Sequence, residues 1–132
     1  TPDLAELVRL VFALAARGEV VLVGRGGGAV LPADSTLNVR VIAPPAERVA
    51  YMSQWLRLPL PEAAAEVAAR DRVRAELHQA LTDRDPADLT QYDLVLNSGR
   101  LGEAATADLI VAAVKAKHLP DTAAEDYPSE PV

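Results

Sequence analysis

Cysteine is absent from this chain of 132 residues, and histidine occurs only twice, as His78 and His118. Without cysteine there is no disulfide framework and no thiolate nucleophile, and two histidines do not make a histidine-rich metal site. No apolar run approaches the ~18 residues that a membrane-spanning helix needs, and Thr1-Pro2-Asp3 begins no signal peptide. We therefore expect a soluble, cytoplasmic protein with no metal site and no membrane partner.

Basic residues are also few: 13 of them stand against 19 acidic residues, and the formal net charge is -6. That deficit argues against a nucleic-acid partner. Four acids and three prolines fall within residues 119–132, which we expect to form a disordered acidic tail. Eleven of the thirteen basic residues are arginine, the side chain suited to bidentate phosphate contacts. A coding bias toward arginine explains the same excess equally well.

Glycine occurs seven times, and four of the seven lie within residues 24–28. The apolar run 20–23 precedes this turn and predicts a strand that is buried on both faces of a parallel sheet. Because open α/β sheets bind ligands beyond the carboxyl ends of their strands, Arg25, Gly26 and Gly27 are candidate anion-binding residues. A tight turn whose glycines supply positive φ is the alternative explanation of the motif.

The rest of the pattern alternates helices with strands. We expect helices over 2–17, 46–57, 61–81 and 102–118, and further strands over 37–43 and 92–97. Strands that alternate with helices predict right-handed crossovers and a parallel sheet. The sequence therefore predicts one α/β domain over residues 1–118, built as a three-layer parallel sheet flanked by helices.

Three further arginines are candidate phosphate ligands. Arg48 begins the helix that follows the second predicted strand, beside the carboxyl end of that strand. Arg70 and Arg74 are one helical turn apart, and with Asp71 they form a block that could clamp a polyphosphate. An exposed face held by salt bridges is the alternative interpretation of this block. We predict that Arg48, Arg70 and Arg74 converge with Arg25 on one pocket.

Four stretches stand in a fixed order along the chain: Val-Val-Leu-Val-Gly-Arg-Gly-Gly at 20–27, Leu-Asn-Val-Arg-Val-Ile-Ala-Pro-Pro-Ala-Glu-Arg at 37–48, Arg-Asp-Arg-Val-Arg at 70–74, and Tyr-Asp-Leu-Val-Leu-Asn at 92–97. Together they resemble the cytidylate kinase-like family of P-loop nucleoside monophosphate kinases, over about residues 5–115. The resemblance implies a parallel sheet flanked by helices. It also implies transfer of a phosphoryl group from ATP, with Mg²⁺, to a nucleoside monophosphate.

The same resemblance implies roles for the arginines. Arg25 would hold the phosphate of the acceptor, and Arg48 would lie near the donor nucleotide. The three residues of the helical block, Arg70, Asp71 and Arg74, would belong to the mobile lid and the acceptor site. Cytidylate kinases proper usually carry aspartate where this chain has Gly26, so the base of the acceptor is left open.

Two parts of the family pattern are absent from these 132 residues, namely the first strand and the Gly-x-x-x-x-Gly-Lys-Ser/Thr loop. Residues 1–18 contain neither a glycine run nor a lysine. Phosphoryl transfer depends on the backbone N–H groups and the lysine of that loop, so we expect the chain alone to be inactive. By resemblance the absent strand separates those at 20–23 and 37–43. These two must then pair directly, or a second chain must fill the slot.

Three functional hypotheses follow. The chain is a kinase-like domain that binds nucleotides and transfers phosphate once a P-loop segment completes it, or a non-catalytic nucleotide-sensing or oligomerising module, or a structural subunit that uses the fold as a scaffold. Binding without turnover supports the second hypothesis, and no nucleotide binding at all supports the third.

Overall fold

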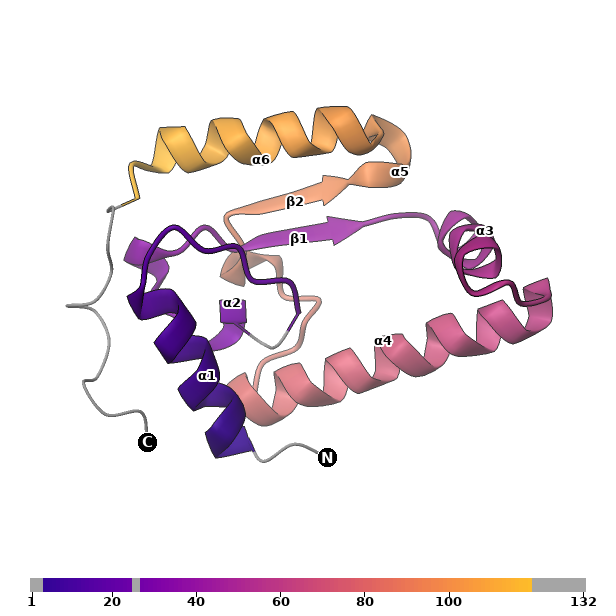
Figure 1. Cartoon of the computed structure of the whole chain (residues 1–132), viewed down its shortest axis with the longest axis horizontal. Coiled ribbons are helices and arrows are strands. Elements are labelled where there is room, and N and C mark those ends of the chain that lie inside the picture. The colour runs from indigo at the N-terminus through magenta and orange to yellow at the C-terminus, as the bar shows by residue number, and fades with distance from the viewer. Residues whose placement is uncertain (1–3, 25–26, 120–132) are drawn as a thin grey trace.

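The computed structural model describes residues 4–24 and 27–119, and Figure 1 traces the whole chain. Arg25, Gly26 and the predicted acidic tail from residue 120 lie outside the described residues. The described chain is mixed α/β and mostly helical. In chain order its elements are α1 (Leu4–Ala16), α2 (Gly27–Val30), the 3-10 helix η1 (Ala33–Ser35), β1 (Val39–Ile42), α3 (Pro45–Leu56), α4 (Leu60–Thr82), the 3-10 helix η2 (Leu89–Gln91), β2 (Leu94–Asn97), α5 (Ser98–Leu101) and α6 (Glu103–Lys117).

The sheet in the described residues has two parallel strands, β1 and β2. Val39 faces Leu94 at one end of the ladder, and Ile42 faces Asn97 at the other. Parallel neighbours need a long crossover, which α3 and α4 supply here. The strands predicted over 37–43 and 92–97 are thus confirmed, and they lie in the centre of the fold in Figure 1.

The strand predicted over residues 20–23 is not formed, and that prediction was wrong. The segment is irregular, and the Val21 and Val23 side chains are 88% and 87% exposed. A strand needs a neighbour for its backbone N–H and C=O groups, and β1 pairs with β2 alone in the described chain. Within residues 4–24 and 27–119 the sheet is therefore a single pair of strands, and no described element covers this valine run.

The four long helices agree with the predicted ones because their ends carry local signals. Helix α3 begins directly after Pro44, and Arg57, the residue after its last turn, adopts a left-handed φ of 55°. Helix α4 begins directly after Pro59, and Asp83, the residue after its last turn, has a φ of 56°. In the described residues, no helix is both long and apolar enough to cross a bilayer.

The buried core is small and divided between two places. Leu7, Val11 and Ala15 are buried along α1, and Ala63 and Val67 are buried on α4, where it packs against α3. These five residues are the only buried apolar ones among those described. Much apolar surface therefore remains open.

Trp55 illustrates that exposure. Its side chain is 65% exposed, and that of Val73 in α4 is 64% exposed. Leu109 and Val114 of α6 are also exposed. The amphipathic patterns are present in the sequence, but within the described chain no further element packs over these faces.

The carboxyl end of α6 is fastened to the sheet by one lysine. Lys117 Nζ donates hydrogen bonds to the Ala33 and Thr36 carbonyl oxygens, at 2.7 and 2.6 Å, and to Asp93 Oδ1 at 2.9 Å. Asp93 Oδ2 accepts a hydrogen bond from the backbone N–H of Asn38 at 2.7 Å. Burial alone would raise the pKa of the Asp93 carboxyl, but these hydrogen bonds and the charge of Lys117 outweigh it and hold the pKa below its ordinary value.

Candidate functional site

The carboxyl ends of both strands open onto a cavity of about 440 Å³, which we call the carboxyl-edge cavity. Ala43 follows β1, and Ser98 and Gly99 follow β2; all three line the cavity together with residues of α3 and α4. Ligand pockets commonly measure ~300 to 1,000 Å³, and open α/β sheets bind ligands at this edge. A pocket of ligand size therefore lies past the carboxyl ends of β1 and β2, whereas the sequence predicted one past the carboxyl end of the 20–23 run.

Four of the predicted site residues line this cavity. Arg48 comes from the first turn of α3, while Arg70, Asp71 and Arg74 come from the middle of α4. Helices α3 and α4 pack against each other, and this packing brings the four side chains to one place. The structure therefore places Arg48, Arg70 and Arg74 along one cavity.

Two of these arginines have acidic partners. The Arg48 guanidinium donates a hydrogen bond to Asp71 Oδ1, and Arg70 Nε donates to Glu66 Oε1 at 2.8 Å. The Arg48 and Asp71 side chains are 32% and 44% exposed, so the pair contributes at most ~1 kcal/mol. The predicted alternative of a salt-bridged face is therefore partly realised. Pairs this exposed can exchange their partner for a ligand oxygen at small cost.

Arg74 differs from its two neighbours. Within the described residues its guanidinium makes no hydrogen bond and no ion pair, although it lines the same cavity. Its five N–H donors remain available for an anion. The cavity also holds Glu47, Asp71 and Glu103, so its three guanidinium groups face three carboxylates.

These carboxylates do not form a three-residue metal-ligand cluster within the described residues. Among the described residues, no group of three histidine, aspartate or glutamate side chains lies close enough to hold a metal ion. Mg²⁺ in phosphate-transfer sites is held by one or two carboxylates together with phosphate oxygens and waters, and arginines along the cavity fit the phosphates of a nucleotide.

Gly99 is a site residue that the sequence reasoning missed. A Cβ at this position would stand 2.3 Å from Glu47 Oε2 and 2.6 Å from Pro44 Cδ, so only glycine fits here. Ser98, one residue earlier, donates from Oγ to the Ile42 carbonyl oxygen at 3.3 Å. Ser98 and Gly99 come directly after the strand predicted over 92–97. That position at the carboxyl end of a strand is the sequence signal by which they could have been found.

The glycine turn is placed only in part. Arg25 and Gly26 lie outside the described residues. Gly27 is buried at the start of α2, where a Cβ would come within 3.2 Å of Leu22 Cδ1. Gly27 does not line the carboxyl-edge cavity. The convergence of Arg25 with the other arginines stays a prediction.

A parallel pair of strands with arginines past its carboxyl ends is typical of α/β proteins that bind phosphate compounds. The family model described as the cytidylate kinase-like family matches residues 4–100. The chain belongs to that family, and membership suggests nucleotide binding.

Two of the individual relatives carry a name that agrees with the family match. The chain is 31% identical over 102 residues to a cytidylate kinase of Ignicoccus hospitalis and 29% identical over 103 residues to one of Methanothrix thermoacetophila, covering 77% and 78% of this chain. It spans 59% of the length of each kinase. A uronate isomerase of Corynebacterium glutamicum is 35% identical over 99 residues, which are 74% of this chain and 19% of that protein. No solved structure matches.

Proposed function

We propose that this chain is a nucleotide-binding domain whose carboxyl-edge cavity holds the phosphate of a nucleoside monophosphate. One observation carries the proposal: Arg48, Arg70 and Arg74, from two helices, line a single cavity past the carboxyl ends of β1 and β2. Three guanidinium groups around one space offer the planar forks that match phosphate oxygens. The described relatives named cytidylate kinase make CMP the first ligand to test.

The arginines take different parts in the proposed binding. Arg74 is available without any rearrangement, whereas Arg48 gives up its bond to Asp71 when a phosphate arrives. Tyr51 lines the same cavity and is 60% exposed, so its ring offers a face on which a base can stack. In this proposal Arg25 completes the phosphate site, since the family resemblance assigns it to the phosphate of the acceptor.

Phosphoryl transfer belongs to the proposal only with a P-loop. ATP and Mg²⁺ supply the transferring group and its charge compensation, and the P-loop lysine and hydroxyl hold them. None of the 132 residues provides that loop. The residues of this chain would bind and orient the acceptor and neutralise its phosphate, and a P-loop segment would complete the enzyme.

A non-catalytic, oligomerising module is the second candidate. The observation that favours it is the apolar surface left open: Val21 and Val23 are almost fully exposed, and Val41 of β1 is 51% exposed. An unpaired strand edge with apolar side chains is a template for another strand. In this reading the chain binds nucleotide and associates with a second chain, and it transfers no phosphate.

Calorimetric titration tests the proposal. CMP, AMP and ATP are titrated into the protein, with cytidine as the matched ligand that lacks only the phosphate. We expect CMP to bind at least about tenfold more tightly than cytidine, since a charge-assisted hydrogen bond contributes ~1.5 to 3 kcal/mol. A coupled kinase assay on the same sample should show no turnover. Equal affinity for CMP and cytidine, or no binding of any nucleotide, contradicts the proposal.

A further inference from the structure

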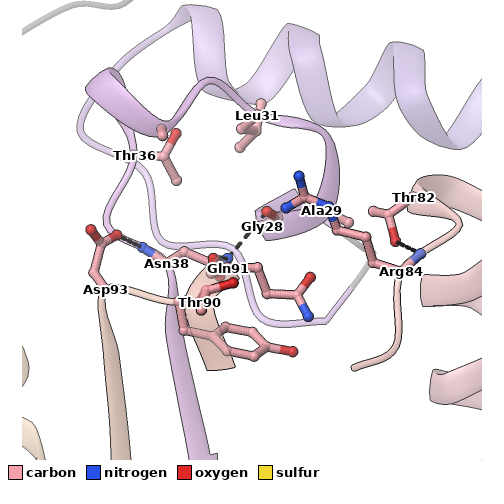
Figure 2. Close-up of a pocket in the computed structure, with 12 residues that line it drawn as sticks. Gly28, Ala29, Leu31, Thr36, Asn38, Thr82, Arg84, Thr90, Gln91 and Asp93 are labelled. Carbon is pink, nitrogen blue, oxygen red and sulfur yellow. Dashed lines mark hydrogen bonds between the residues drawn. The ribbon is translucent and has the colours of Figure 1, made fainter. Parts of the chain in front are cut away.

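A second cavity, of about 470 Å³, lies at the opposite edge of the sheet, and we call it the amino-edge cavity (Figure 2). Asn38 directly precedes β1 and Asp93 directly precedes β2, so the cavity lies at the amino ends of the strands. Gly28 of α2 and Gln91 of η2 form two further walls. It shares no lining residue with the carboxyl-edge cavity.

A hydrogen-bond network holds the walls of the amino-edge cavity in place. Asn38 Nδ2 donates to the Gly28 carbonyl oxygen at 3.2 Å and to the Gln91 carbonyl oxygen at 2.8 Å. Gln91 Nε2 donates to the carbonyl oxygens of Asp85 and Asp88, at 2.8 and 2.9 Å. A Cβ at Gly28 would stand 2.1 Å from Asn38 Oδ1, so the close approach needs glycine. The polar wall is therefore preorganised rather than assembled by a ligand.

Two charged side chains line this cavity, and only one is neutralised by a close partner. Asp93 forms its ion pair with Lys117. The Arg84 guanidinium makes no hydrogen bond or ion pair among the described residues, and Figure 2 shows the side chain reaching across the cavity toward Gly28. The pKa of the Asp88 carboxyl is lowered mainly by hydrogen bonds from Thr90. The charge of Arg84 is the smallest of the causes of that shift.

We propose that the amino-edge cavity is a second binding site, for a hydroxylated organic anion whose phosphate or carboxylate is held by Arg84. The cavity is large enough for a ligand of about the size of a sugar. Arg84 offers a free fork for the anionic group. The Thr36 hydroxyl and the amide oxygen of Asn38 line the other side and suit hydroxyl groups of the ligand.

Titrations followed by ¹⁵N-resolved NMR test this site directly. The probes are glucose 6-phosphate for the phosphate form, gluconate for the carboxylate form, and glucose as the neutral control. We expect at least one anion to shift the amide signals of Asn38, Arg84 and Gln91 in a saturable way, while glucose does not. Saturation by one anion only identifies the anionic group. Shifts confined to Ser98 and Gly99, or no saturable shift with either anion, overturn the proposal.

Variants separate this site from the nucleotide site. Arg84 is exposed, so Arg84→Ala should fold normally and should weaken binding of the anion at least about tenfold. Arg72→Ala, which removes the same charge outside both cavities, should bind as the wild type does. Arg74→Ala should also leave this affinity unchanged, whatever it does to CMP binding. Wild-type affinity in Arg84→Ala would show that the cavity holds no anion through Arg84.

Discussion

The two sides of β1 behave in opposite ways. On one side β1 pairs with β2, and Lys117 ties the end of α6 to the entrance of the same sheet. On the other side the described chain offers no partner strand. The valine run at 20–23, which also has no partner strand among the described residues, is irregular and exposed. The valines have the intrinsic preference for a strand in both places. The difference teaches that the non-local partner, and not the local preference, decides whether a strand forms.

The largest expected effect on the free energy of unfolding concerns the buried face of α1. Val11 of α1 is 1% exposed, so Val11→Ala leaves a cavity and should lower the free energy of unfolding by ~2 to 3 kcal/mol. Leu10, its neighbour on the same helix, is 49% exposed, so Leu10→Ala should cost clearly less. Urea melts of both variants measure the difference. Equal losses would mean that α1 has no defined buried face.

The hydrogen bonds of Lys117 test the side on which β1 pairs with β2. Lys117→Met keeps the aliphatic stem but removes three hydrogen bonds, and we expect a loss of ~2 kcal/mol in unfolding free energy. Lys115→Met, two residues earlier on the same helix, is the control and should stay within ~0.5 kcal/mol of the wild type. A Lys117→Met protein as stable as the control would show that α6 is not fastened through this side chain.

Asp93 adds a pH dependence to the same contact. Its pKa is lowered in the folded protein, so its contribution to stability is present above the pKa of the unfolded chain and is lost as pH falls through the folded value. Asp93→Asn should therefore be less stable than the wild type at neutral pH, by less than Lys117→Met. Denaturation between pH 2 and 7 should show the two proteins converging at acidic pH. A difference that grows toward low pH contradicts this sign.

The smallest effect on stability is expected on the open side. Val21→Ser combined with Val23→Ser should change the unfolding free energy by no more than ~0.5 kcal/mol, because both side chains are already in water. Self-association, measured by sedimentation at rising protein concentration, should decrease in this double variant. A large loss of stability instead would mean that the run is buried in the folded chain.

Local signals account for what the sequence predicted correctly. Pro44 and Pro59 mark the starts of α3 and α4, and the spacing of Arg70 and Arg74 puts them on one helix face whatever the tertiary contacts are. The rule for the carboxyl edges of parallel strands then placed Arg48 near them. The helix starts and the shared face of Arg70 and Arg74 depend on residues close together in the chain, whereas the approach of Arg48 depends on the packing of α3 against α4.

The parts that sequence reasoning missed depend on distant contacts. The state of 20–23 depends on a neighbouring strand, and the exposure of Trp55 depends on which element covers α3. Gly99 matters because Glu47 and Pro44 approach it from a remote segment. Arg84 belongs to a loop with no motif, and only the folded chain brings it to Gly28 and Asn38.

The affinity of Arg74→Ala for CMP, measured by calorimetry beside Arg72→Ala, tests the central claim most directly. Both changes remove one arginine from α4, but only Arg74 lines the carboxyl-edge cavity. We predict that Arg74→Ala binds CMP at least about tenfold more weakly than the wild type, while Arg72→Ala matches it. Equal affinities in the two variants would contradict a phosphate site at the carboxyl edge of this sheet.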